Sequence, residues 1–222
     1  NAAGHGGYNE FRSFIPNPKA FNEYRNKDGI KGLFYTSAEK EHSLKYGNMA
    51  LMTQNDSVTY KTNWLDGGWW DGIHDLWDDF CEDGLLEAES KFEGTGNRLN
   101  YFQLKVGSLG IYQVVEAKQE KIFEFILTWY FPNRVKNWDE DSCCCSNGEC
   151  ETVRNYYATL FKDAWHAGEY ILENLERLEK QSRDFHRALF SSTLPPYVID
   201  ALASNITVCR STTCFRLEDG TF

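Results

Sequence analysis

The chain has 222 residues, of which 41% are hydrophobic and 15% aromatic, so it carries enough apolar side chains for one large domain or two modest ones. Its net charge of −10 repels phosphate backbones, and no run rich in lysine and arginine offsets that charge, so nucleic acid is not an expected partner. The longest apolar run, residues 122–131, is interrupted by Glu124 and is too short to span a membrane.

The chain up to residue 137 is rich in predicted strands. Short runs of aromatic and β-branched residues are separated by Gly, Asn and Asp, which is the pattern of strands joined by turns. Repeated strands at this spacing favour a β-sandwich. In the last of these strands nearly all positions on both faces are apolar, so we expect both faces to be largely covered. The predicted strands are residues 32–36, 48–53, 57–64, 104–115 and 121–131.

Residues 63–80, here called the aromatic–acidic stretch, hold four tryptophans, two glycine-containing turns and five aspartates. Tryptophan combines a large apolar area with one N–H donor, so such a cluster fits a core, a contact between domains or a platform for a sugar ring. The candidate substrate-binding residues are Trp69, Trp70 and Asp71. The spacing of the aspartates fits no calcium loop, and we expect them to form a solvated acidic face.

Residues 138–152 are polar, acidic and without periodicity, which is typical of a linker. They contain Cys143, Cys144, Cys145 and Cys150. Structural zinc is usually bound by pairs of ligands from two separate knuckles, and here there is one cluster with no histidine close to it, so we expect no metal site. We interpret the segment as a loop with reduced or locally bridged thiols. No phosphate loop or dinucleotide fingerprint occurs, so no cofactor is expected.

Beyond the linker the hydrophobic period changes from two to about 3.6. This predicts one long amphipathic helix over residues 163–190 and a second helix over residues 196–203. The last nine residues are predicted to form a strand that enters a turn at Asp219-Gly220. Two helices cannot bury their apolar stripes alone, so we expect the helical domain to continue past Phe222.

The predicted organisation is therefore a β-sandwich domain over residues 1–137, a linker over residues 138–152 and the beginning of a helical domain over residues 153–222. The sandwich is expected to be partial at its amino end, because the first residues have neither an initiator methionine nor the pattern of a signal peptide.

Several short motifs follow one another along most of the chain. They are YGNMA at 46–50, VTY at 58–60, GGWWDG at 67–72, WDDF at 77–80, TWYFPNR at 128–134, NYY at 155–157, ENL at 173–175, STLPP at 192–196 and CFRLEDG at 214–220. In this order they resemble glycoside hydrolase family 116, which contains non-lysosomal glucosylceramidases (bile acid β-glucosidases) and bacterial β-glucosidases and β-xylosidases.

The resemblance implies an amino-terminal β-sandwich followed by the first helices of an incomplete (α/α)6 barrel. It also implies retaining hydrolysis of a β-glucoside by a glutamate nucleophile and an aspartate acid/base. In the family both catalytic residues come from the helical domain, well after the LEDG segment. We therefore expect the catalytic residues beyond Phe222, assign no catalytic role to Glu218 or Asp219, and expect residues 1–222 alone to be inactive.

For the full-length protein the resemblance implies a β-glucoside substrate, a glycolipid or an oligosaccharide, and an intramolecular contact with the rest of the helical domain. Without a visible signal peptide we favour an intracellular location, and a lipid substrate would bring peripheral membrane association. The alternative function is a non-catalytic carbohydrate-binding or structural β-sandwich module that docks on a helical partner, with Trp69 and Trp70 stacking on a sugar.

Overall fold

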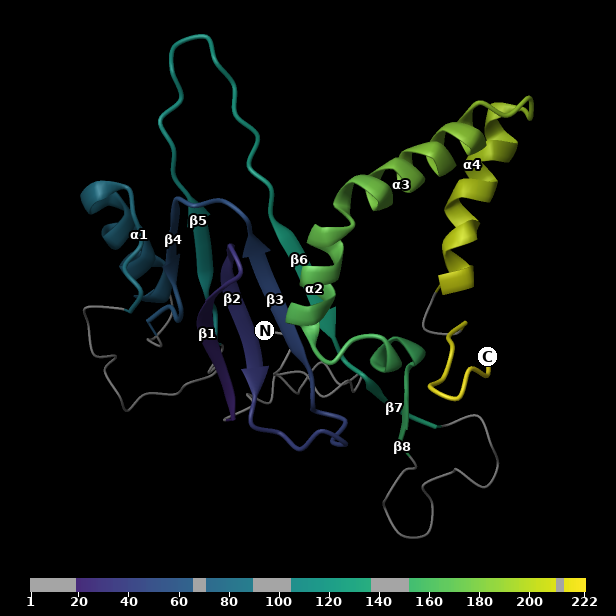
Figure 1. Cartoon of the computed structure of the whole chain (residues 1–222), viewed down its shortest axis with the longest axis horizontal. Coiled ribbons are helices and arrows are strands. Elements are labelled where there is room, and N and C mark those ends of the chain that lie inside the picture. Colours follow the sequence, from purple (N-terminus) through teal and green to yellow (C-terminus); the bar gives the residue numbers. More distant parts are fainter. Residues whose placement is uncertain (1–18, 66–70, 90–104, 137–151, 211–213) are drawn as a thin grey trace. The chain divides into compact units, whose positions relative to one another are not determined.

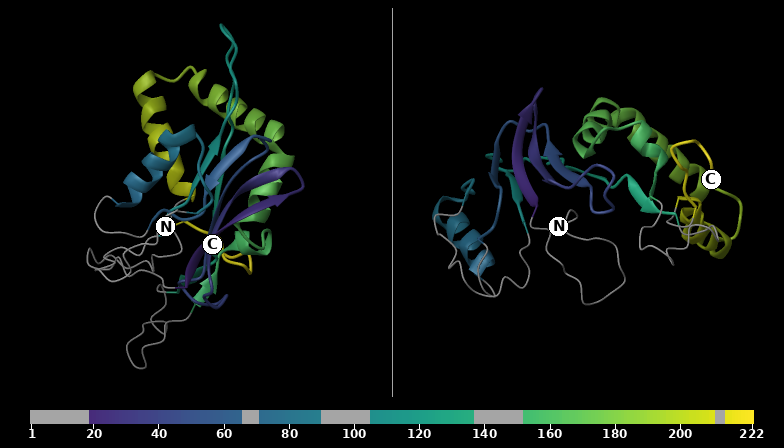
Figure 2. Two further views of the ribbon diagram at one scale, coloured as in Figure 1. Left: turned by 90° about the vertical axis from the view of Figure 1, so that its left-hand side faces the viewer. Right: turned by 90° about the horizontal axis from the view of Figure 1, so that it is seen from below.

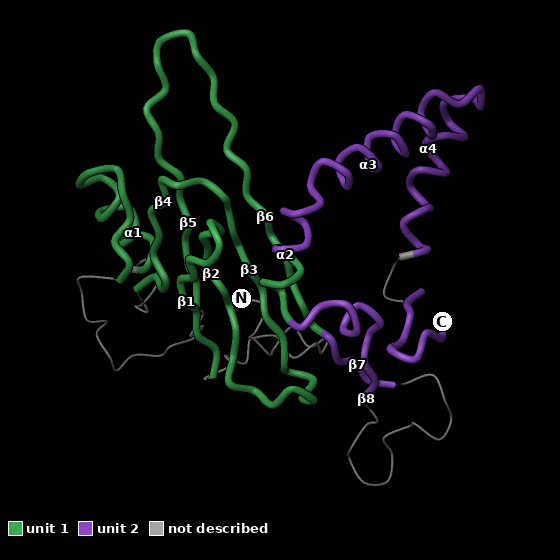
Figure 3. Tube along the Cα trace, viewed as in Figure 1, with its two compact units in different colours: residues 1–131, 163–168 green, residues 132–162, 169–222 purple. Residues whose placement is uncertain are grey.

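The structure, a computed structural model, describes residues 19–65, 71–89, 105–136, 152–210 and 214–222 (Figure 1). They divide into two compact units, which are described separately: residues 1–131 with 163–168, and residues 132–162 with 169–222 (Figure 3). Sheets and helices both occur, which confirms the predicted mixture of β and α structure. The predicted domain boundaries at residues 137 and 152 stay predictions.

The main sheet of the first unit has four antiparallel strands in the order β1-β2-β3-β6 (Figure 1). Asp28 and Gly29 join the first two strands, and both have the positive φ that a tight hairpin turn requires (53° and 78°). The predictions over residues 32–36 and 48–53 are confirmed. The strand bounds are β1 (Ala20–Lys27), β2 (Ile30–Ser37), β3 (Asn48–Thr53) and β6 (Ile126–Tyr130).

A second, two-stranded sheet packs against β1 and β2. Its strands are β4 (Val58–Lys61) and β5 (Ser108–Ile111). The rings of Tyr24 and Tyr60 stack with their centroids 3.8 Å apart, and the Tyr35 hydroxyl donates to the Gly107 carbonyl at 3.2 Å. The Asn22 amide donates to backbone carbonyls beside both strands. The two sheets therefore pack together, in agreement with the β domain that is predicted for the amino-terminal part of the chain.

The core of the first unit also lies on the opposite face of the main sheet. Ala164 and Trp165 open helix α2 (Ala164–Glu173) and are 0% and 3% exposed. Gly168, one turn later, lies so close to Met52 that a Cβ there would come within 2.1 Å of the Met52 sulfur. Helix α2 thus begins as a covering layer on this face.

Three of the predicted strands are too long: the prediction over residues 57–64 corresponds to β4, that over 104–115 to β5 and that over 121–131 to β6. Strand β5 ends at Ile111 and β6 begins at Ile126, and residues 112–125 between them form an extended loop that projects beyond the sheets (Figure 2). Coverage on both faces of residues 121–131 was also wrongly predicted, because Ile122 is 86% exposed, Phe125 44% and Leu127 52%. Within the described ranges no strand pairs with this loop, so its alternating apolar residues have no ladder to join.

The second unit begins with a short hairpin of β7 (Asn133–Val135) and β8 (Thr152–Arg154). The predicted linker therefore connects two paired strands, and its residues 138–151, including the four cysteines, lie outside the described residues. The turn at Asp219-Gly220 is confirmed, with the Gly220 N–H donating to the Leu217 carbonyl at 2.9 Å. The predicted strand before it is only an isolated bridge between Asn155 and Leu217.

The predicted helix over residues 163–190 is two helices, α2 and α3 (Leu175–Phe190). The break is at Asn174, whose backbone N–H and side-chain amide both donate to the Tyr170 carbonyl. Such a local side-chain bond competes with the regular helix ladder. The next prediction is confirmed by α4 (Pro196–Asn205), and short 3₁₀ helices lie at Tyr156–Thr159 and Ile206–Arg210. None of the described helices has the length and apolarity needed to cross a membrane.

Candidate functional site

The aromatic–acidic stretch ends in a helix that the sequence analysis missed, α1 (Asp71–Asp83). Its better buried positions, Gly72, Asp75, Leu76 and Asp79, recur at intervals of three and four residues and share one helix face. Glycine is needed at the first of these, since a Cβ would lie 2.8 Å from a backbone carbonyl of the preceding segment. The helix ends at Gly84, which adopts the positive φ (82°) typical of a helix C-terminus.

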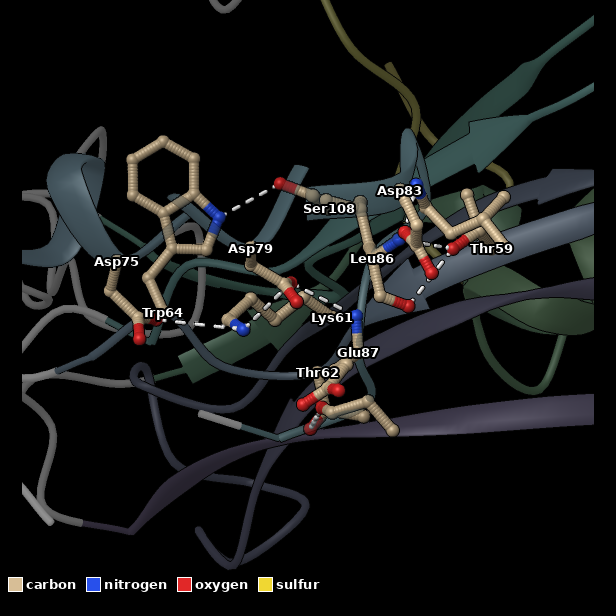
Figure 4. Close-up of polar contacts among 12 residues, drawn as sticks. Thr59, Lys61, Thr62, Trp64, Asp75, Asp79, Asp83, Leu86, Glu87 and Ser108 are labelled. Carbon is tan, nitrogen blue, oxygen red and sulfur yellow. Dashed lines mark hydrogen bonds and ion pairs between the residues drawn. The ribbon is translucent and has the colours of Figure 1, made fainter. Parts of the chain in front are cut away.

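The inward face of α1 carries two carboxylates that meet one lysine from strand β4 (Figure 4). The Lys61 ammonium lies 3.1 Å from Asp79 Oδ2 and 3.5 Å from Asp75 Oδ2. All three side chains are buried, with 1%, 9% and 5% exposed for Lys61, Asp79 and Asp75. We call these three residues the Lys61 cluster.

Charges removed from water in this way are tolerated only when they are paired and further hydrogen-bonded. Asp79 meets this requirement twice, because the same Oδ2 that faces the lysine also accepts the backbone N–H of Glu87 at 2.9 Å. The cluster therefore joins β4, α1 and the segment that follows α1 through one ammonium group.

The segment after α1 is bonded to β4 along its length (Figure 4). The Thr59 hydroxyl donates to the Leu86 carbonyl at 2.9 Å and accepts the Leu86 N–H at 2.6 Å. The backbone N–H and hydroxyl of Thr62 both donate to the Ala88 carbonyl at 2.9 Å. These bonds and the Lys61 cluster hold α1 on the second sheet from both its inner face and its carboxyl end.

The arrangement is suited to positioning a helix and not to glycosidic chemistry. A retaining glycosidase needs two carboxyl groups about 5 Å apart that flank a bound sugar. Asp75 and Asp79 instead converge on the same ammonium group and are shielded from solvent. The chemistry of the cluster is therefore ion pairing in the interior.

The expected solvated acidic face is correct for only part of the stretch. Asp78, with Glu82 next to the helix end, is exposed, whereas Asp75 and Asp79 are not. Sequence reasoning missed Lys61 altogether. A signal was present, because two aspartates four residues apart share a helix face and a single lysine interrupts an otherwise uncharged predicted strand.

The candidate substrate-binding residues cannot be placed together in this site. Trp69 and Trp70 lie outside the described residues, and Asp71 begins α1 with a side chain that is likewise outside them. The other two tryptophans of the stretch differ in environment. Trp64 is half-buried and donates its indole N–H to the Ser108 hydroxyl at 2.8 Å, whereas Trp77 is 62% exposed.

The LEDG segment forms a turn in the second unit. The Asp219 carboxylate accepts the Thr221 backbone N–H at 2.9 Å and its hydroxyl at 2.7 Å, and these bonds lower the pKa of Asp219. The Glu218 carboxylate lies 3.9 Å from the Arg154 guanidinium. Both acidic side chains thus contribute to local turn and ion-pair contacts.

The described cysteines, Cys81, Cys209 and Cys214, are exposed thiols. Across the ranges that the structure describes, no group of three or more histidine, cysteine, aspartate or glutamate side chains is arranged to hold a metal ion. The Cys143–Cys150 segment is not among those ranges.

A model of a known protein family matches most of the chain. Residues 6–178 match the family model described as beta-glucosidase 2, glycosyl-hydrolase family 116 N-term. The match includes both sheets, α1 and all three residues of the Lys61 cluster, and it ends in the first turn of α3. No curated protein matches the chain.

Proposed function

The chain belongs to glycosyl-hydrolase family 116, and from this membership we propose that it is the amino-terminal, sheet-bearing part of a retaining β-glucosidase. The observation that carries the proposal is the family match over residues 6–178. The packing of two antiparallel sheets in the first unit supports it, since the resemblance implies an amino-terminal sandwich.

In this proposal the reaction runs through a glycosyl-enzyme intermediate. A carboxylate nucleophile attacks the anomeric carbon while a carboxylic acid protonates the leaving oxygen. The acid, now deprotonated, then takes a proton from water, whose oxygen attacks the anomeric carbon and releases the nucleophile. We assign both groups to helical residues outside residues 1–222. The pairing of Asp75 and Asp79 with Lys61 supports this assignment, because both carboxylates are already committed to a structural contact.

The proposed substrate is a β-glucoside whose aglycone is a lipid or a further sugar. We propose that the sandwich contacts the helical domain within the same molecule and that Trp69, Trp70 or Asp71 reaches the aglycone across that contact. Replacing Trp69 or Trp70 by alanine in the full-length protein should then raise KM for a bulky aglycone with little change in kcat. The matched control is Trp77→Ala, which removes an exposed tryptophan of the same stretch.

The decisive experiment compares the 222-residue chain with the full-length product of the same gene. We expect the full-length protein to hydrolyse 4-nitrophenyl β-glucoside and to release β-glucose first, as followed by NMR, while the 222-residue chain shows no hydrolysis. Release of α-glucose first would overturn the retaining mechanism. Hydrolysis by the 222-residue chain would place the catalytic pair inside it. An inactive full-length protein whose sandwich binds oligosaccharides would favour the non-catalytic alternative.

A further inference from the structure

The break between α2 and α3 runs against the apolar pattern of the sequence. Ile171, Leu175 and Leu178 follow one another at intervals of four and three residues across it, which is the spacing of a single helix face. Glycine and proline, the usual causes of a helix break, are absent from residues 169–190 of the sequence. Something else must therefore interrupt the helix at Asn174.

The side chain of Asn174 is one cause of the break. Its Nδ2 donates to the Tyr170 carbonyl at 2.9 Å, and the same carbonyl accepts the Asn174 backbone N–H at 3.2 Å. That N–H is shared with the Ile171 carbonyl at 3.1 Å. With φ −116° and ψ 12°, Asn174 has left the helical conformation. A side chain that enters the backbone ladder in this way interrupts a helix.

The guanidinium group of Arg177 spans the break. Its Nη2 donates to the Tyr170 hydroxyl on α2 at 2.9 Å and to the Asn174 side-chain carbonyl at 3.1 Å. Its Nη1 donates to Gln181 Oε1, one turn further along α3, at 3.1 Å. The rigid fork of arginine donors is suited to holding several acceptors at once. We call these four side chains, Tyr170, Asn174, Arg177 and Gln181, the Arg177 strap.

The α2 end of the strap is anchored by packing. The ring of Tyr170 packs against the ring of Phe161, which precedes α2, with the centroids 5.6 Å apart. The start of α2 is fixed as well, because Ala164 is buried and Gly168 lies against the Met52 side chain. Since α2 is held at both places, the contacts at Asn174 decide whether the helix continues into α3.

We propose that the Arg177 strap is a conformational latch: it keeps α2 and α3 apart as two helices, and the chain forms one continuous helix over residues 164–190 when the latch is released. In the broken form the first amides of α3 have no backbone acceptor, as at any helix start. In the continuous form the amides of residues 175–177 bond to the carbonyls of residues 171–173. The strap bonds lie at the exposed surface, where each contributes little, so one substitution is enough to shift the balance.

Amide hydrogen exchange of the purified 222-residue chain, followed by NMR, tests the proposal. In Asn174→Ala the amides of residues 175–177 should exchange at least tenfold more slowly than in the unmodified chain, because they gain backbone acceptors. Arg177→Ala should slow them less, since the Asn174 side chain can still bond to the Tyr170 carbonyl. Far-UV circular dichroism should show added helix in both variants. Unchanged protection of the β2 amides will show that each variant is folded.

The matched control is Arg183→Ala, the same substitution at an α3 arginine that pairs with Glu179 inside the helix at 2.8 Å. It should leave exchange at residues 175–177 unchanged. Tyr170→Phe removes only the hydroxyl acceptor and should act like Arg177→Ala with the least disturbance of the fold. Unchanged or faster exchange at residues 175–177 in Asn174→Ala or Arg177→Ala would overturn the proposal, because the strap would then only protect the start of α3. Equal slowing in Arg183→Ala would also overturn it, because helix propensity alone would explain the change.

Discussion

The side-chain carbonyl of Asn48 on strand β3 accepts the backbone N–H of Ala164, 116 residues later in the chain, at 2.7 Å. Asn48 is 2% exposed and Ala164 opens helix α2, so the bond satisfies a buried donor that has no partner within the helix. On the adjacent strand the Thr128 hydroxyl donates to the Ala164 carbonyl at 2.7 Å. Two strands of the sheet thus hold the first residue of this helix.

Replacing Asn48 by alanine should destabilise the first unit by about 1–3 kcal/mol, because the Ala164 N–H would stay buried without an acceptor. Asn48→Asp should cost less, since a carboxylate can accept the same bond and is favoured at a helix amino terminus. Urea unfolding followed by tryptophan fluorescence would give both values. Equal stability of Asn48→Ala and the unmodified chain would contradict the proposed cap.

The Lys61 cluster predicts a larger loss. In Lys61→Met two carboxylates remain buried without their cation, and breaking a buried pair in this way costs about 3–5 kcal/mol. Asp79→Asn should cost less, because Asp75 can still pair with the lysine. Urea unfolding again measures the loss, and hydrogen exchange in α1 should rise first.

A matched control for the cluster is the exposed ion pair between Lys31 and Asp56. Its atoms lie 3.0 Å apart, but the Asp56 side chain is 97% exposed. Lys31→Met should therefore cost less than about 1 kcal/mol. Similar losses for the two lysine variants would show that burial is not what makes Lys61 important.

Gly32 and Gly168 should differ in how much stability an added methyl group costs. At Gly32 a Cβ would lie 2.2 Å from the Leu51 carbonyl oxygen and 2.8 Å from the Met52 Cα, which are backbone atoms fixed by the sheet. Gly32→Ala should cost about 3 kcal/mol. At Gly168 the clash is with the Met52 sulfur, so a shift of a flexible side chain limits the loss to about 1–2 kcal/mol.

A second substitution, followed by thermal unfolding, distinguishes the side-chain clash at Gly168 from the backbone clash at Gly32. Met52→Ala removes the side chain that obstructs Gly168→Ala, so the double variant should be more stable than the sum of the two single losses predicts. The same substitution should not relieve Gly32→Ala, whose obstruction is backbone. Additive losses at Gly168 would count against its close contact with Met52.

The helices and strands that could be predicted are those whose apolar residues follow a regular local spacing. Strands β2 and β3 follow the alternation of their sequences, and α4 follows its proline start and helical period. The break between α2 and α3 at Asn174 could not be predicted, because the helical spacing of apolar residues continues across it. Only the structure shows that the Asn174 side chain bonds to the Tyr170 carbonyl. Helix α1 was hidden by aromatic residues, which strands and helices both accept.

The candidate site shows a different limit. The spacing of Asp75 and Asp79 indicates a shared helix face, but their pairing with Lys61 is a contact between a helix and a strand, and the local pattern does not specify that partner. The aspartates were therefore assigned to the surface, where most acidic residues lie. The prediction of a strand over residues 121–125 was wrong for a related reason. Alternation shows that a segment can form a strand, but not that a partner strand lies beside it.

Tyr35 makes the stability of the first unit depend on alkaline pH. Burial raises the pKa of Tyr35 from 10.0 to about 12, and its hydroxyl is held by the Gly107 carbonyl. Between about pH 10 and 12 the unfolded chain loses this proton while the folded chain keeps it, so unfolding becomes more favourable as pH rises. Since Tyr35 is only partly buried, we expect a loss of about 1–2 kcal/mol over this window.

Tyr35→Phe should cost about 1 kcal/mol at neutral pH through the lost hydrogen bond. Between about pH 10 and 12, however, the free energy of unfolding measured in urea should decline less in this variant than in the unmodified chain. Tyr112→Phe, at a tyrosine that is 48% exposed, is the control and should leave the decline unchanged. An equal decline in the unmodified chain and Tyr35→Phe would mean that another group releases the proton, and would contradict the assignment to Tyr35.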